Sequence, residues 1–176
     1  MDKNAIAQMS RKNSESIFIN GYKIDFVCYD HIFLSMSYQW LTDPETKRLT
    51  MTPDITREGQ EKWFAGLFER TDYYIRGILS NGKPIGAVGI KNICGKTGEY
   101  WGYIGEKEYR GHGIGHALVD QMCQDAIYMG LTSLYLHVAD FNLRAYKLYE
   151  QHGFIPEEIM NGIVYMRKNL SPKIDD

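Results

Sequence analysis

The sequence predicts a mixed α/β fold whose sheet is partly antiparallel and partly extended by crossover connections. Three observations support this prediction. Strand-like runs alternate along the chain with segments of helical periodicity. The Asn-Gly pairs at 20–21 and 81–82 mark tight turns between neighbouring strands. A glycine-rich segment at 111–115 connects a strand to an amphipathic helix.

The N-terminal part combines a hairpin with helices. The expected elements are strands at 17–19 and 22–28, then helices at 30–41, from Pro44, and from Thr56 to about residue 70. Pro44 suits the first turn of a helix, because its missing N–H would have no helical partner there. Thr56 is suited to an N-cap, because its hydroxyl can accept from the first amides of the helix.

The rest of the chain alternates strands and helices. The expected elements are strands at 73–80, 84–92 and 98–105, a helix at 113–129, a strand at 133–138, a helix at 142–152, and strands at 154–159 and 162–168. Gly130 and Gly153 follow the two helices, where glycine commonly ends a helix in a left-handed conformation.

Length and composition limit the functional classes. A chain of 176 residues with 44% hydrophobic residues can bury the core of one domain, expected at 17–170. The net charge of −2 at pH 7 gives no overall attraction to nucleic acid or an anionic membrane, so neither is an expected partner. Cys28, Cys94 and Cys123 are far apart, which predicts reduced thiols in a cytoplasmic protein and no metal site.

The two ends of the chain carry no expected element. Residues 1–16 are polar and read as an N-terminal extension, and 171–176 read as a tail. The N-terminal residues have no apolar stretch of the kind found in a signal peptide, and no apolar run approaches the ~20 residues of a membrane-spanning helix.

The glycine-rich segment has the chemistry of an anion site. The first N–H groups of a helix have no internal partner, and the helix dipole adds partial positive charge there. Glycines let such a backbone approach a bulky anion, and Arg110 adds a cation. A P-loop would need Gly-Lys-Ser/Thr, and a dinucleotide fingerprint would need Gly-x-Gly-x-x-Gly, but neither pattern is present. A glycine-rich turn without a ligand remains the alternative.

Two segments together resemble the GCN5-related N-acetyltransferase (GNAT) superfamily. Residues 110–115, Arg-Gly-His-Gly-Ile-Gly, are similar to its Arg/Gln-x-x-Gly-x-Gly/Ala element. Residues 136–154 are similar to its strand, its Asn-x-x-Ala-x-x-Leu-Tyr helix and its Gly-Phe end. The segments 40–45 and 98–101 resemble the branch with ribosomal-protein N-terminal, spermidine and amino-sugar-nucleotide acetyltransferases.

The resemblance implies a twisted mixed sheet of about seven strands with splayed central strands, flanked by about four helices. It implies acetyl-CoA as co-substrate, with no metal. The pantetheine arm would pair with the strand that ends near residue 105, and Asn142 would face the cofactor. The residues expected to bind the cofactor are Tyr103, Ile104, Gly105, Arg110, Gly111, His112, Gly113, Ile114, Gly115 and Asn142.

Catalysis would need an acid for the leaving thiolate and a base for the amine. The resemblance places Tyr149 near the cofactor sulfur as the acid, with core packing as the alternative. Glu99 and His137 are the two candidate bases. For Glu99 the alternatives are an anchor for a cationic substrate or a solvated strand end, and for His137 a structural role.

The expected acceptor is a small primary amine, with an amino-sugar nucleotide favoured. A protein N-terminus is the close alternative. A polyamine would need several carboxylates, for which Asp43, Glu45 and Asp54 are available. Five aromatic residues could line the acceptor pocket, with core packing as the default for most of them: Trp40, Trp63, Trp101, Tyr73 and Tyr74. A module that binds acetyl-CoA without catalysis is the alternative from another class. Relatives often pair, which makes a homodimer an expectation with no interface readable here.

Overall fold

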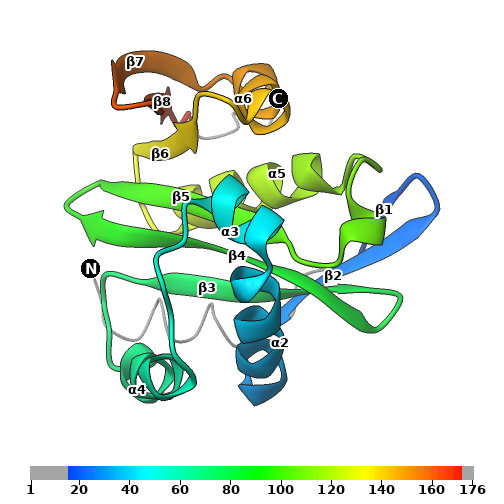
Figure 1. Cartoon of the computed structure of the whole chain (residues 1–176). Coiled ribbons are helices and arrows are strands. Elements are labelled where there is room, and N and C mark those ends of the chain that lie inside the picture. The colour runs from blue at the N-terminus through cyan, green and yellow to red at the C-terminus, as the bar shows by residue number, and fades with distance from the viewer. Residues whose placement is uncertain (1–15, 172–176) are drawn as a thin grey trace.

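The computed structural model of the chain describes residues 16–171 and arranges them as one mixed sheet with helices on both faces (Figure 1). Except for Ser16 and Ser171, the expected extension and tail lie outside the described residues. The mixed α/β prediction is confirmed. The sheet has eight strands in the order β1-β2-β3-β4-β5-β6-β8-β7.

The observed elements follow the expected order. The strands are β1 (Ile17–Ile19), β2 (Tyr22–Cys28), β3 (Tyr74–Ser80), β4 (Lys83–Cys94), β5 (Thr97–Ile104), β6 (Ser133–Ala139), β7 (Ile155–Met160) and β8 (Ile163–Asn169). The α-helices are α2 (His31–Thr42), α3 (Pro44–Thr50), α4 (Arg57–Leu67), α5 (Ile114–Tyr128) and α6 (Leu143–Gln151). A short 3₁₀ helix, η1 (Lys107–Tyr109), was not expected.

Side-chain caps and tight turns fix the element boundaries. Asp30, Asp43 and Thr56 accept main-chain N–H bonds at the starts of α2, α3 and α4. The Asn20-Gly21 pair has φ values of 47° and 88°, as a two-residue hairpin turn requires. Local chemistry therefore sets these boundaries where the sequence predicted them, although α4 ends at Leu67 rather than near residue 70.

Two hydrophobic clusters cover the two faces of the sheet. One cluster joins α5 to β2–β6 and β8 and includes Met122, Val88 and Leu134. The other joins α2 and α4 to β3 and β4 around Phe33 and Ile75. Because successive strand residues point to opposite faces, β3 and β4 supply both clusters and form the centre of the fold.

The sheet divides between β5 and β6. These strands pair in parallel over only three residue pairs, from Thr97–Ser133 to Glu99–Tyr135. Beyond Glu99, β5 keeps its antiparallel partner β4 as far as Ile104, whereas β6 turns away with β8 and β7 (Figure 1). The expected splay of the central strands is therefore present, and it leaves one edge of β5 open.

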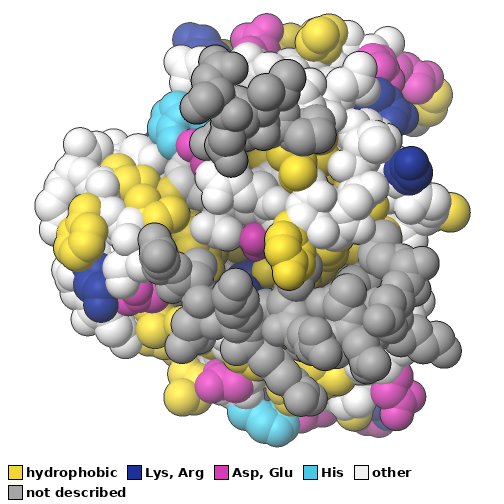
Figure 2. Space-filling view, turned by 180° about the vertical axis from the view of Figure 1, so that it is seen from behind, with side chains coloured by type: hydrophobic (Ala, Val, Ile, Leu, Met, Phe, Trp, Pro, Cys, Tyr) yellow, Lys and Arg dark blue, Asp and Glu magenta, His cyan; other side chains and the backbone are white. Residues whose placement is uncertain are grey.

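The surface has scattered apolar side chains. Those exposed on separate elements include Phe18, Ile32 and Tyr128, and the space-filling view from behind shows hydrophobic groups in several places (Figure 2). Cys123 is buried in α5, Cys94 is exposed, and none of the three cysteines forms a disulfide. Among the described helices, none has the length and apolar character needed to cross a membrane.

Candidate active site

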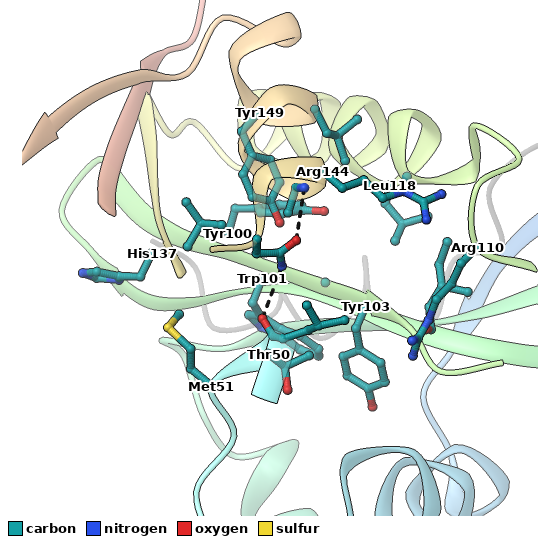
Figure 3. A pocket seen from close by; sticks show the side chains of 18 of the residues that line it. Thr50, Met51, Tyr100, Trp101, Tyr103, Arg110, Leu118, His137, Arg144 and Tyr149 are labelled. Atoms are coloured by element: carbon teal, nitrogen blue, oxygen red, sulfur yellow. Dashed lines mark hydrogen bonds between the residues drawn. The ribbon is translucent and has the colours of Figure 1, made fainter. Parts of the chain in front are cut away.

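A cavity of about 770 Å³ lies where β5 and β6 separate (Figure 3). Its walls come from β5, β6, the end of α3, the glycine-rich turn and the facing sides of α5 and α6. A cavity of this size can hold a ligand of cofactor dimensions. The sheet division thus places an open strand edge beside the segment predicted to bind an anion.

The open edge of β5 has a defined register. The N–H of Gly105 donates to the carbonyl of Ile85 at 2.7 Å, so this residue faces β4. Main-chain groups alternate in direction along an antiparallel strand, and those of Ile104 and Gly102 therefore face the division. The main-chain groups of Tyr103 and Gly105 face β4, so the expected main-chain contacts of both residues are corrected, although Tyr103 lines the cavity. Gly102 was missed because the direction of its main-chain groups depends on the pairing with β4.

The glycine-rich turn adopts the backbone conformation expected of it. Gly111 and Gly113 have φ values of 88° and 82°, in the left-handed region that favours glycine. Gly113 is the N-cap of α5 and provides no side-chain cap, so the first amides of the helix stay open to a ligand. Gly111, Gly113 and Gly115 line the cavity. His112 and Ile114 do not: the ring of His112 lies 5.1 Å from that of Tyr22, and Ile114 is buried.

Arg110 has a role in holding the turn in place. Its Nε donates to the carbonyl of Ile104 at 2.8 Å, and its guanidinium also donates to Thr46 Oγ1 at 2.8 Å. Glu45 lies 3.5 Å from the same group. The expected charged clamp is therefore occupied by protein partners, and it ties the end of β5 to α3 while still lining the cavity.

Arg144 was missed by the sequence analysis. Its guanidinium lies over the glycine-rich turn, so close that a methyl group added at Gly111 would lie 2.9 Å from one of its nitrogens (Figure 3). It forms no hydrogen bond or ion pair within residues 16–171 and it lines the cavity. The available signal was its place in the first turn of the helix that follows Asn142. Arg144 thus supplies an unpaired cation beside the open amides.

Asn142 connects α6 to α3. Its Oδ1 accepts the N–H of Ala145 as the N-cap of α6, and its Nδ2 donates to the carbonyl of Leu49 at 3.4 Å. Asn142 lines the cavity, as expected, but its amide group is used for these two contacts. Its position on the cavity wall follows from its role in starting the helix.

Tyr149 reaches the cavity from α6, which lies on one face of the sheet (Figure 3). Its ring lies 5.7 Å from Tyr100 and 6.0 Å from Phe154 in edge-on contacts. Burial raises the pKa of the Tyr149 phenol to about 12. The hydroxyl has no hydrogen-bond partner in the described part of the chain. Tyr149 therefore presents a protonated phenol to the cavity at neutral pH.

Glu99 of β5 and His137 of β6 form a pair across the division, on the opposite face of the sheet from Tyr149. His137 Nδ1 lies 3.0 Å from Glu99 Oε1, and Asn92 Nδ2 donates to Glu99 Oε2 at 2.8 Å. The carboxylate can only accept, so His137 carries its proton on Nδ1 and leaves Nε2 as a base. Lys91 Nζ lies 3.6 Å from Glu99 Oε1. The two bases proposed separately from the sequence thus form one hydrogen-bonded unit, and Figure 3 shows His137 directed away from Tyr149.

The carboxylates considered for a polyamine lie elsewhere. Asp43 and Glu45 bind Lys107, whereas Asp54 binds Lys47, and none of the three carboxylates lines the cavity. The charged residues that do line it are the cations Lys91, Arg110, Arg144 and Lys147 and the anion Glu99. The cavity is therefore predominantly cationic.

Comparison with known proteins identifies the family. The sequence model of the acetyltransferase (GNAT) family matches residues 34–154, which is more than half of the chain. The protein belongs to the acetyltransferase (GNAT) family. It is an N-acetyltransferase, and the matched range contains both the glycine-rich turn and α6.

Individual relatives support the family assignment. The candidate phosphinothricin acetyltransferase YwnH of Bacillus subtilis is 30% identical over 120 residues, covering 65% of this chain and 72% of its own. The acetyltransferase also shares its fold with spermidine N-acetyltransferase from Vibrio cholerae, solved with CoA and spermine (TM-score 0.75, 18% identity, 84% and 95% of the two chains). Campylobacter jejuni PseH, solved with acetyl-CoA, has a TM-score of 0.67 at 17% identity over 84% and 99%.

Proposed function

We propose that this acetyltransferase binds acetyl-CoA in the cavity between β5 and β6. The pyrophosphate lies against the open amides of residues 111–115, with Arg144 as its cation. The pantetheine arm follows the edge of β5 at Gly102 and Ile104, where main-chain groups can bind it as an added strand. The observation that carries this proposal is the juxtaposition of an open strand edge, an uncapped helix start and an unpaired arginine in one cavity.

We assign His137 as the general base and Glu99 as the residue that positions it. Bound acetyl-CoA supplies a thioester carbonyl for direct attack by an amine, and the amine must lose a proton. His137 Nε2 is the acceptor for that proton, because Nδ1 is held by Glu99. The carboxylate stabilises the imidazolium that forms and fixes the orientation of the ring. Direct proton transfer to Glu99 is the alternative.

Tyr149 is assigned as the general acid for the leaving thiolate. A phenol with a pKa of about 12 stays protonated across the neutral range and can deliver its proton to a departing sulfur. The acid and base candidates approach the division from opposite faces of the sheet. A thioester placed in this division would therefore have an acid on its leaving-group side and a base on its acceptor side.

We infer that the acceptor is a small primary amine that also carries an anionic group. Lys91 stands beside Glu99 on the acceptor side, where Trp101 and Tyr73 add aromatic surface. With Glu99 as the one carboxylate among the described lining residues, a polyamine would meet more positive than negative charge. An amino-sugar nucleotide has the required combination of an amine and an anion, and a protein N-terminus is the second candidate.

The test is a panel of amines in a thiol-release assay with acetyl-CoA. The panel contains an amino-sugar nucleotide, phosphinothricin, spermidine and a peptide with a free N-terminus. We expect turnover with an anionic amine, and we expect Lys91→Ala to raise its KM without a similar effect on a neutral amine. Preferential turnover of spermidine would contradict the acceptor assignment. A lack of acetyl-CoA binding would contradict the cavity assignment itself.

A further inference from the structure

Three titratable side chains form a connected row beside the cavity. His116 Nδ1 lies 2.8 Å from His152 Nε2, and His152 Nδ1 lies 3.0 Å from Asp120 Oδ1. His116 and Asp120 are four residues apart on α5 and therefore share one side of that helix. His152 is the C-cap of α6. His116 also lines the cavity, next to Gly113 and Gly115, so the row ends at the site proposed for phosphate.

The row fixes where its protons lie. The Asp120 carboxylate accepts, so His152 carries a proton on Nδ1. A neutral His152 then has a bare Nε2, which accepts the Nδ1 proton of His116. The remaining nitrogen, His116 Nε2, has no hydrogen-bond partner within the described chain. In the neutral state it carries a lone pair, which repels a phosphate oxygen, whereas a protonated ring presents an N–H donor and a positive charge.

Burial makes His152 an unfavourable site for an added proton. The side chain of His152 is 11% exposed, and burial lowers its pKa. Lys168 of β8 donates to the carbonyl of His152 at 2.6 Å and adds a positive charge on that side. His116 is exposed, and the charged residues that α6 adds to the wall of the same cavity are Lys147 and Arg144. Cys123 contacts Lys168 from α5, and burial raises the pKa of its thiol, which keeps it neutral.

We propose that His116 is a phosphate ligand that becomes protonated when acetyl-CoA binds, with His152 and Asp120 as its positioning residues. This inference rests on the proposed cofactor site. The proton comes from solvent to His116 Nε2, and the new N–H donates to a phosphate oxygen. The N–H bond at Nε2 forms as a solvent O–H bond breaks, and no other covalent bond changes. Acetyl-CoA affinity then decreases as the pH rises and the imidazolium becomes harder to form.

Calorimetric titration of acetyl-CoA in buffers with different ionisation enthalpies measures this proton directly. Near neutral pH we expect uptake of roughly half a proton per molecule bound, which is the most that a tenfold preference for the protonated ring allows. We expect the Kd to rise about tenfold between pH 6 and pH 8, as loss of one charge-assisted hydrogen bond would give. His116→Gln should remove the uptake and the pH dependence. His31→Gln is the matched control, because the His31 ring packs against Phe64 outside the cavity.

The outcomes separate the inference from the proposed function. Tight binding of acetyl-CoA without proton uptake, or uptake that persists in His116→Gln, would overturn the role of His116 and leave the cofactor site intact. No binding would overturn both. Titration with 3′-dephospho-CoA then identifies the phosphate: retained uptake assigns it to the pyrophosphate, and lost uptake assigns it to the 3′-phosphate. Either result supports a protonated His116.

Discussion

Replacement of Gly111 by alanine tests the cofactor turn with a perturbation that has two separable effects. Gly111 has a φ of 88°, where an alanine costs about 1–2 kcal/mol of backbone strain. For a chain of this size, that strain lowers the Tm by about 2–8 °C. The added methyl group would also lie 2.9 Å from an Arg144 nitrogen and displace the guanidinium from the turn. Loss of a charge-assisted contact predicts an acetyl-CoA Kd about tenfold higher.

Gly130→Ala is the matched control for this prediction. Gly130 has a φ of 79°, follows α5 at its other end, and has open space around the position of an added methyl group. The two variants should therefore lose similar stability in thermal unfolding, but only Gly111→Ala should lose affinity in calorimetric titration. Wild-type affinity in Gly111→Ala, or an equal loss in both variants, would refute the assignment of the turn.

Three further predictions concern the chemistry and the acid stability. Tyr149→Phe should lower kcat by about 100-fold or more, while the acetyl-CoA Kd stays within about twofold. Because the pKa of Tyr149 is about 12, its ionisation should cause no decrease in wild-type activity below about pH 11. An unchanged kcat in the variant would exclude the acid role. His137→Gln and Glu99→Gln should each lower kcat, and the double variant should have a kcat only slightly lower than either, since the two residues act as one unit. Additive losses of activation free energy in the double variant would show that the roles are independent. The Thr46 N–H bond and the Lys107 contact lower the pKa of Asp43 from 3.8 to about 2. The contribution of the Asp43 carboxylate to folding stability is therefore complete above about pH 4 and is lost as the pH falls through 2. Asp43→Asn should make the Tm decrease less steeply with falling pH in that window, and a decrease as steep as in the wild type would contradict the cap.

The sequence predicted most of the elements because their boundaries depend on local chemistry. The Asn-Gly turns, the Asp and Thr caps and the left-handed glycines each act through residues a few positions apart. Contacts between distant segments could not be read in this way. Glu99 and His137 are 38 residues apart, and nothing in the spacing shows that they share a hydrogen bond.

The candidate site was predicted in outline and revised in detail. The glycine pattern located the turn at 111–115, and the left-handed φ values of Gly111 and Gly113 agree with that reading. The free cation was assigned to Arg110, which the structure pairs with Thr46 and Glu45, and Arg144 was overlooked. Which arginine stays unpaired depends on how α3 and α6 pack around the turn. The sequence contains no local signal for that packing.

A crystal structure of the protein with bound CoA would test the central claim most directly. The account predicts that the pyrophosphate contacts the amides of residues 111–115 and that the pantetheine arm lies along β5 at Gly102 and Ile104. It also predicts that the sulfur lies within hydrogen-bond distance of the Tyr149 hydroxyl. CoA bound outside the division between β5 and β6, or a sulfur remote from Tyr149, would contradict the account.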